Sequence, residues 1–207
     1  MDHLIHLSTP GGDVVTTTAA NSRPLRADAV RNRKLVTAAA AKLLARDGES
    51  TSMRAIAREA GVGLATVYRQ FPDKAALYAA MIADQITALT ELARSKADDG
   101  DPGAAFFDYF AESVASSDGQ KLLVDGLIAA GVDYDAALGS LNQDLHQATE
   151  VLLRRAQQAG AVRLDLGMPE LRGLLTATCL GAERQHWDDR LRTRILGIVF
   201  DGFRPAT

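Results

Sequence analysis

One short stretch in the first half of the chain combines side chains that could read the edges of base pairs. Leu64, Ala65 and Thr66 are small or apolar, which suits contact with the methyl group of thymine. Arg69 and Gln70, near the far end of the stretch, carry hydrogen-bond donors. The chemistry available here is recognition in a groove of a nucleic acid, provided that one element presents these side chains together.

The twenty residues that begin at Ser52 predict that element. Their pattern indicates a helix, a glycine turn and a second short helix. Small Ala57 lets the second helix cross closely, and Gly61 ends the first helix, where a left-handed residue costs least. Val62 is expected to be a buried apolar residue in the turn, and Val67 of the second helix is expected to pack at the point where the two helices cross. Two helices that meet steeply across a turn of about three or four residues place a recognition helix in the DNA major groove.

We expect this recognition helix over about residues 64–70. Pro72 disfavours a helical residue before it and so ends the helix, and Asp73 can cap the helix that follows. Thr51 and Arg54 lie at the start of the preceding helix, where they are expected over the sugar–phosphate backbone or the groove edge.

This region resembles the DNA-binding domain of the TetR/AcrR family of bacterial repressors over roughly residues 30–80. The matching residues are Asp47-Gly48, Thr51, Arg54, Ile56-Ala57, Ala60-Gly61-Val62, Thr66-Val67-Tyr68, Phe71 and Lys74. Gly63 departs from the family, which usually has Ser or Thr there, so a side-chain phosphate contact is lost. The resemblance implies that the Tyr68 hydroxyl and the Lys74 ammonium hold phosphates, with the amide groups at the start of the next helix. The alternative for Tyr68 is a half-buried core aromatic.

Composition favours an all-α protein. The 207 residues are 47% hydrophobic but only 5% aromatic, and alanine and leucine dominate. No apolar run approaches the roughly 18 residues of a transmembrane helix. The first 22 residues lack Lys, Arg and a continuous apolar core, so no secretory signal is expected. Cys179 is the single cysteine, which suits a reducing cytoplasm, and we expect that location.

The charge is unevenly distributed along the chain. Residues 23–74 carry 11 Lys/Arg and 5 Asp/Glu, a net charge of +6. Residues 75–207 carry 12 and 19, a net charge of −7, and the whole chain has −3. A basic N-terminal part on an acidic body is typical of a protein whose polyanionic partner meets one end only.

Turn and breaker residues divide the chain into three parts. We expect a flexible tail over 1–28, a three-helix helix-turn-helix domain over 29–76, and a larger helical bundle for effector binding and dimerisation over 77–207. Besides the two short helices above, the expected helices lie near residues 29–46, 74–96, 103–117, 119–130, 134–160, 168–186 and 188–203, about nine in total.

The C-terminal part is similar to the SbtR-like subgroup of TetR C-terminal domains at residues 155–165, 169–171 and 201–204. An apolar pocket between helices would bind a small molecule. Its candidate lining residues are Ile82, Ile86, Phe106, Phe110, His146 and Cys179, although core packing is the commoner role for the phenylalanines. Trp187 either lines a pocket or packs at a subunit interface.

Two histidine–carboxylate pairs could each share a helix face. His146 and Glu150 are four residues apart, and Glu183 and His186 are three apart. The Glu-x-x-His spacing occurs in helical di-iron sites, but such sites need further carboxylates at matching places, which this sequence does not supply convincingly. We therefore expect no metal, no cofactor and no catalytic site, so that the chain is not an enzyme; a helical metal-dependent oxidoreductase is the minor alternative.

A homodimer is expected because one recognition helix reads too few base pairs for useful specificity. The predicted interface consists of Leu171, Leu174, Leu175, Thr178, Leu191, Ile195, Ile198 and Phe203, some of which must serve the core of their own subunit. The sequence thus predicts a homodimeric repressor that binds a palindromic double-stranded DNA operator, without a membrane partner, and is released by a small-molecule effector. The alternative is a helical DNA-binding protein with no effector.

Overall fold

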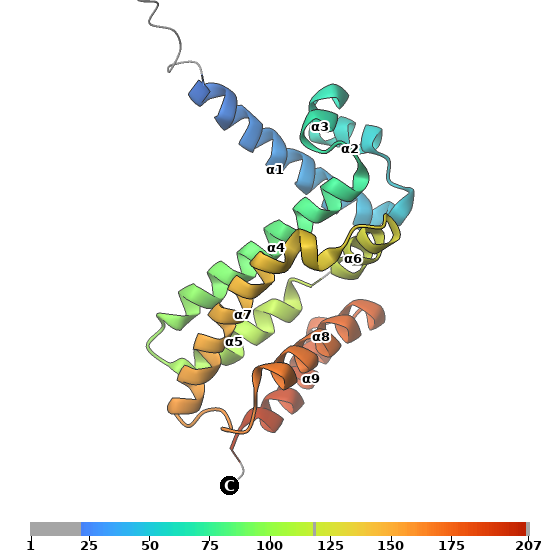
Figure 1. Cartoon of the computed structure of the whole chain (residues 1–207). Helices are drawn as coiled ribbons and strands as arrows, with labels where there is room; N and C mark the ends of the chain where they lie inside the picture. The colour runs from blue at the N-terminus through green and yellow to red at the C-terminus, as the bar shows by residue number, and fades with distance from the viewer. Residues whose placement is uncertain (1–21, 118, 206–207) are drawn as a thin grey trace, which may run out of the picture.

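The computed structural model describes residues 22–117 and 119–205, and within these ranges it contains nine α-helices, one 3-10 helix and no strand (Figure 1). The expected all-α fold is confirmed. The elements are α1 (Ser22–Asp47), η1 (Gly48–Ser50), α2 (Met53–Ala60), α3 (Leu64–Gln70), α4 (Lys74–Ala97), α5 (Pro102–Ala115), α6 (Gln120–Ala129), α7 (Tyr134–Gln158), α8 (Met168–Gln185) and α9 (Asp189–Phe203). None of these helices has the length and hydropathy that a membrane span requires.

The first helix begins earlier than the sequence predicts. α1 starts at Ser22 instead of near Ala29, so residues 22–28 are helical and not part of a flexible tail. Pro24 contributed to the expectation of a tail. It lies in the first turn of α1, however, where backbone amides have no intrahelical acceptor and proline is tolerated. The rest of the expected tail, residues 1–21, lies outside the described residues.

Local interactions set both ends of α2 and the start of α4. The Ser52 side chain accepts the Ala55 N–H at 3.2 Å and caps α2. The Asp73 carboxylate accepts the Ala76 N–H at 2.7 Å and caps α4. Gly61 ends α2 in the left-handed region, with φ of 64°. Because these bonds satisfy backbone groups that helix ends leave unpaired, the helix-turn-helix folds as its sequence indicates.

The first apolar core joins the helix-turn-helix to the body. Val36, Ile56 and Val67 from α1, α2 and α3 are fully buried. Leu77 of α4 and Leu127 of α6 are equally buried in the same cluster. Figure 1 shows α1, α2 and α3 at one end of the molecule, where α4 begins. The DNA-binding helices therefore share their core with the body.

The second apolar core lies at the other end and is aromatic. The Phe203 ring of α9 meets those of Phe106 and Phe110 of α5 edge to face, with centroids 5.9 and 5.4 Å apart. The buried Tyr109 hydroxyl lies 3.0 Å from the Thr149 hydroxyl of α7, and burial raises the pKa of Tyr109. This core packs α5, α7, α8 and α9 together.

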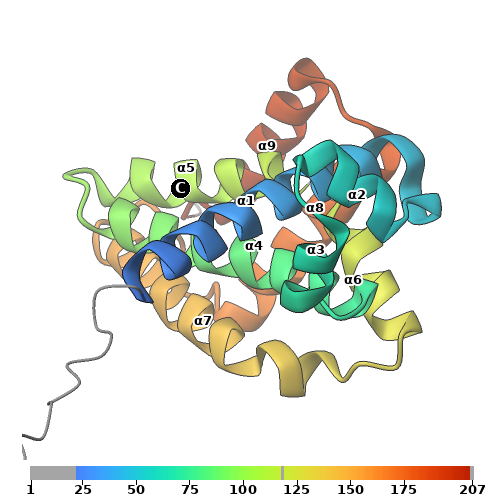
Figure 2. The same cartoon turned by 90° about the horizontal axis from the view of Figure 1, so that it is seen from above.

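The long helix α4 connects the two cores. It has 24 residues and is about 36 Å long at 1.5 Å per residue. Ile82 lies in the first core and Ala93 in the second. Seen from above, α5 and α7 flank α4 (Figure 2). A displacement of α4 therefore affects both ends of the molecule.

A glycine allows α6 to lie close to α4. A Cβ atom on Gly126 would overlap the Tyr78 ring, and no small shift removes an overlap of that kind. Tyr78 itself is buried, so its ring has little room to move away. Gly126 is thus required at this helix crossing for steric reasons.

Candidate nucleic-acid interface

The recognition helix forms with the expected bounds, Leu64–Gln70. In the turn before it, the Val62 N–H donates to the Ala57 carbonyl at 3.0 Å, which fixes the chain as it leaves α2. Val67 is fully buried, and Ala57 is nearly so, as the close crossing of the two helices requires. Gly63 caps α3 without a side-chain hydrogen bond.

The outer face of α3 carries most of the predicted base-reading side chains. Ala65 and Arg69 are exposed, and Leu64 and Thr66 are partly exposed. Tyr68 is 47% exposed, which places it on the outer face rather than in the core. Arg54, at the start of α2, is also exposed. A single surface therefore presents apolar contacts and hydrogen-bond donors.

The structure places Thr51 differently from the sequence expectation. Only 4% of Thr51 is exposed, and its hydroxyl is buried without a hydrogen-bond partner among the described residues. A side chain buried between η1 and α2 cannot lie over a sugar–phosphate backbone in this state. The sequence does not reveal this because η1, a short 3-10 turn, folds Thr51 inward.

Two predicted contact residues already hold hydrogen bonds to the protein. Gln70 Nε2 donates to the Ala29 carbonyl of α1 at 3.0 Å. Lys74 Nζ donates to the Glu49 carbonyl of η1 at 2.6 Å. Both bonds are exposed, so nucleic acid can compete for either donor. The bond from Gln70 was not predicted, because its acceptor is a backbone carbonyl 41 residues earlier in the sequence.

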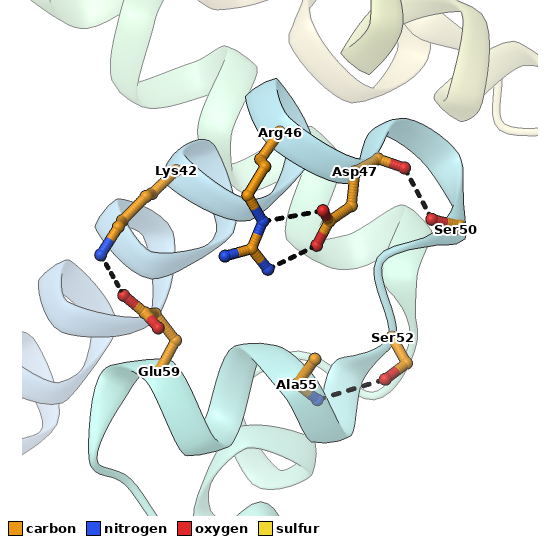
Figure 3. Close-up of polar contacts among 7 residues, drawn as sticks. All are labelled: Lys42, Arg46, Asp47, Ser50, Ser52, Ala55 and Glu59. Atoms are coloured by element: carbon orange, nitrogen blue, oxygen red, sulfur yellow. Dashed lines mark hydrogen bonds and ion pairs between the residues drawn. The ribbon is translucent and has the colours of Figure 1, made fainter.

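Ion pairs neutralise several basic residues on the sides of this domain (Figure 3). Lys42 of α1 pairs with Glu59 of α2 at 2.5 Å, and Arg46 forms two hydrogen bonds to Asp47 at 2.8 and 2.7 Å. The hydrogen bond from Lys42 holds the pKa of Glu59 below its usual range. The hydrogen bonds from Arg46 likewise lower the pKa of Asp47. Both pairs are exposed and add little stability, but the Lys42–Glu59 pair joins α1 to α2 and so helps to position the two helices.

Most of the remaining positive charge of the described residues lies on α2, α3 and the start of α4, and one further unpaired cation, Lys34, lies on α1. Within the described part of the chain, the basic residues of this domain without an acidic partner are Lys34, Arg54, Arg58, Arg69 and Lys74. Their charge is available to a polyanion without breaking an ion pair. The net positive charge predicted for this region is therefore concentrated near the recognition helix.

Most of the residues predicted to line a ligand pocket are buried in the two apolar cores. Ile82, Ile86, Phe106 and Phe110 are at most 3% exposed and pack in the two cores. Helical spacing predicts that a side chain faces inward but not whether the opposite wall is already filled. Cys179 is partly buried against α5, with its sulfur 4.0 Å from the Ser113 carbonyl.

A cavity of about 620 Å³ lies instead where the DNA-binding helices meet the body. This junction cavity is lined by residues from α1, η1, α4, α6, α8 and α9, by Gly119 just before α6, and by His186 and Trp187 between α8 and α9. His146 lines a different cavity of about 530 Å³, between α7 and α8. Glu183 and His186, the second histidine–carboxylate pair, both line the junction cavity. No set of three potential metal ligands comes together within the described ranges.

The predicted interface residues divide into two groups. Leu171 and Phe203 are 2% exposed and belong to the core of their own chain. Thr178 is also buried and donates its hydroxyl hydrogen to the Leu174 carbonyl at 2.7 Å. Leu175 and Ile195 are partly buried. The exposed members are Leu174 at 41%, Leu191 at 39% and Ile198 at 73%.

Comparisons with known proteins agree with this geometry. Residues 36–81 match the model of the bacterial regulatory proteins of the tetR family. Residues 101–205 match the C-terminal domain described as transcriptional regulator SbtR-like. The second match covers about half of the 207 residues and includes α5 to α9.

Similar proteins of known structure cover most of the chain. A TetR transcription regulatory protein from Mycobacterium vanbaalenii is 34% identical, with a TM-score of 0.71, and the match covers 88% of this chain and 100% of that one. The TetR transcriptional regulator SCO0520 from Streptomyces coelicolor is 26% identical, with a TM-score of 0.67, covering 84% and 99%. A curated HTH-type transcriptional regulator from Staphylococcus aureus, SAB2452, is 44% identical over 54 residues, which are 26% of this chain and 29% of that protein.

Proposed function

The chain belongs to the TetR family of bacterial transcriptional regulators, and from this premise we propose that it is a homodimeric repressor which binds a palindromic DNA operator and leaves it when a small molecule binds. Members of the family are DNA-binding regulators and not enzymes. The observation that carries the proposal is the exposed face of α3, with free positive charge on α2, α3 and the start of α4.

In this proposal α3 enters the major groove. Leu64, Ala65 and Thr66 lie near its N-terminal end and contact thymine methyl groups, while Arg69 donates to base edges or phosphates. Tyr68 and Lys74 hold phosphates, and Lys74 exchanges the Glu49 carbonyl for a phosphate oxygen. Gln70 reads a base only after it releases the Ala29 carbonyl, and Thr51 supports α2 from the interior.

Dimerisation would use the exposed apolar side chains of α8 and α9. Leu174, Leu191 and Ile198 remain exposed within the described part of the chain. Exposed apolar groups on neighbouring helices are typical of a subunit interface. A two-fold axis through this surface would place two recognition helices on the same DNA duplex.

Release by a small molecule is supported by the position of the junction cavity. Its walls come from α1 and η1 on the DNA-binding side and from α6 and α8 on the body side. A molecule bound there would contact both parts, and its affinity would depend on their separation. Such a difference in affinity between two states is what couples an effector to DNA binding.

Selection from a random double-stranded DNA library tests the DNA-binding part. We expect enrichment of a two-fold symmetric sequence, and Arg69→Ala should bind it at least about tenfold more weakly, because a good base contact contributes about 1–3 kcal/mol. Arg184→Ala, at an exposed arginine of α8, serves as the control and should bind like the unmodified protein. No enriched sequence, or an asymmetric single half-site, would contradict the proposal.

Sedimentation tests the dimer. Ile198→Glu places a charge in the proposed interface and should yield monomers with an unchanged helical circular-dichroism spectrum. Leu164→Glu, at a leucine that is 82% exposed but lies between α7 and α8, should leave the dimer intact. A monomeric unmodified protein that binds the selected palindrome tightly would show that α8 and α9 do not pair.

A further inference from the structure

Two residues that line the junction cavity each carry a buried polar atom without a hydrogen-bond partner among the described residues. Gln85 Oε1 of α4 is an acceptor, and Arg192 Nε of α9 is a donor. A buried polar atom without a partner is costly, and such atoms in native proteins usually face a ligand, an ion or water. Both atoms belong to residues that line the same cavity, so they mark it as a binding site rather than a packing gap.

Of the two charged residues compared here, one is paired within the protein and the other is not. Arg192 donates to the Asp189 carboxylate at 3.0 Å and to the Trp187 carbonyl at 3.3 Å, so its positive charge is already paired. Glu183 accepts only the Lys121 N–H, at 3.4 Å, and forms no ion pair within the described part of the chain. The unpaired charge facing the cavity is therefore negative, which favours a cationic occupant over an anionic one.

The other walls are suited to a flat apolar group. Leu44, Met81 and Leu123 line the cavity from α1, α4 and α6. The Trp187 ring lies against Gly181 of α8, where a Cβ atom would come within 3.0 Å of the ring. The indole N–H is used by the Gln185 side chain at 3.2 Å, so the ring offers an apolar and cation-binding face.

From these contacts we propose that the junction cavity binds a small molecule with a flat apolar body and a protonated amine. The amine is held by Glu183 and by Gln85 Oε1, and the apolar body packs against Trp187 and Leu44. Arg192 Nε offers one further donor, to a neutral acceptor on the ligand. This inference deepens the proposed function and rests on it only for the consequence that binding alters DNA affinity; the binding itself is a separate claim.

Trp187 is the only tryptophan of the chain, so its fluorescence reports directly on the cavity. The probes are phenylbutylamine, phenylbutanol and phenylbutyrate, which differ only in the end group. We expect saturable quenching or a shift of Trp187 emission by the amine. The amine should bind at least about tenfold tighter than the acid, since a hydrogen bond to a charged group contributes about 1.5–3 kcal/mol. No saturable change with the amine, or equal or tighter binding of the acid, would overturn the proposal.

Two pairs of variants locate the site. Glu183→Gln should remove the preference for the amine, while Glu91→Gln, at an exposed glutamate of α4 away from the cavity, should keep it. Ala41→Phe should fill the cavity from α1 and abolish binding of all three probes. Ala38→Phe, one turn earlier and also exposed, should not. Because Ala41 is exposed, the larger side chain leaves the core intact, and a circular-dichroism melt checks this. An unchanged preference in Glu183→Gln would overturn the role of the carboxylate.

The link to DNA is tested separately. Phenylbutylamine is titrated into the complex of the protein with the DNA selected above, and the DNA affinity is measured by fluorescence anisotropy. We expect a decrease of about 5-fold or more, and DNA should weaken amine binding by the same factor. Amine binding without this reciprocity would leave the site in place and would contradict effector release, whereas failure of the fluorescence titration contradicts the site itself.

Discussion

The two apolar cores of the molecule differ in the side chains that fill them. The core beside the recognition helix consists mainly of aliphatic residues such as Val36, Ile56 and Val67 around a single phenylalanine, Phe71, from the helix-turn-helix. The core at the far end is built around the rings of Phe106, Phe110, Phe200 and Phe203.

This difference indicates how each end is held together. Large rings bury more apolar area per residue and gain from edge-to-face contact, so a few side chains can secure α5 and α9. The aliphatic core is supplemented by local devices, namely the Ser52 and Asp73 caps and the Lys42–Glu59 pair. The aromatic end has polar contacts of the same kind, namely the Asp101 and Asp188 caps and the Lys96–Glu112 pair, so the two ends differ in how their cores are filled and not in their surface contacts.

Phe203→Ala should cause the largest loss of folding stability among these variants. Removing a fully enclosed ring typically costs about 3–5 kcal/mol, because the cavity closes only partly. Ile56→Ala in the aliphatic core should cost about 2–5 kcal/mol, and we expect the lower part of this range because the substitution removes a smaller side chain than Phe203→Ala does. Urea unfolding followed by circular dichroism measures both. A smaller loss for Phe203→Ala than for Ile56→Ala would contradict the greater contribution of the aromatic core.

Gly126→Ala should have the next largest effect. The added methyl group overlaps the Tyr78 ring and separates α6 from α4, at a cost of about 1–3 kcal/mol. Gly139 of α7 has no neighbouring atom within 4 Å of an added Cβ, so Gly139→Ala is the matched control. It should stabilise the helix by about 0.5–1 kcal/mol. Thermal unfolding of both variants separates steric overlap from helix propensity, and an equal change in both would exclude the overlap.

Lys74→Ala tests the surface contacts of the DNA-binding end. It should weaken binding to all DNA sequences alike, because a phosphate contact carries no base information. It should also reduce the slope of log affinity against log salt concentration by about one per half-site. Anisotropy titrations at several salt concentrations provide both quantities. A change in the preferred sequence with an unchanged salt slope would place Lys74 at a base.

The Lys42–Glu59 pair should give the smallest effect, visible as pH dependence. Its hydrogen bond lowers the pKa of Glu59 in the folded chain, so its stabilisation is present above the usual glutamate pKa. This contribution is lost as the pH falls through the window below the usual glutamate pKa of about 4.3. Glu59→Gln should therefore reduce the fall in melting temperature over that window. The same slope in variant and parent would show that the pair contributes nothing to folding.

The helix-turn-helix could be predicted closely because its signals are contiguous. Gly61, Pro72 and Asp73 each act on the residues beside them, so the bounds of α3 follow from a few neighbouring positions. Tyr68 is exposed, as its predicted phosphate contact requires, and that contact stays a prediction. Thr51 was not, because its burial depends on how η1 folds against the body rather than on its neighbours.

The binding sites of the body could not be predicted in the same way. A cavity arises where side chains from distant helices fail to meet, and periodicity within one helix contains no information about that. Ile86 was therefore predicted to line a pocket, although it is buried in the core. Trp187 lines the cavity, but the sequence left open whether it would line a pocket or pack at a subunit interface. The exposed positions of α8 and α9 depend likewise on how these helices rotate against α5 and α7.

The sharing of α4 between both cores has a consequence for cooperativity. Leu77 and Ile82 belong to the same cluster as Val36 and Ile56, and Ala93 belongs to the aromatic cluster. A fragment that ends near residue 76 would expose the apolar side of its own helices, since Leu77 and Leu127 complete their packing. The functional boundary between DNA-binding helices and body is therefore not a folding boundary. Calorimetry of the whole chain should record one heat-absorption peak, with equal calorimetric and van't Hoff enthalpies, instead of two.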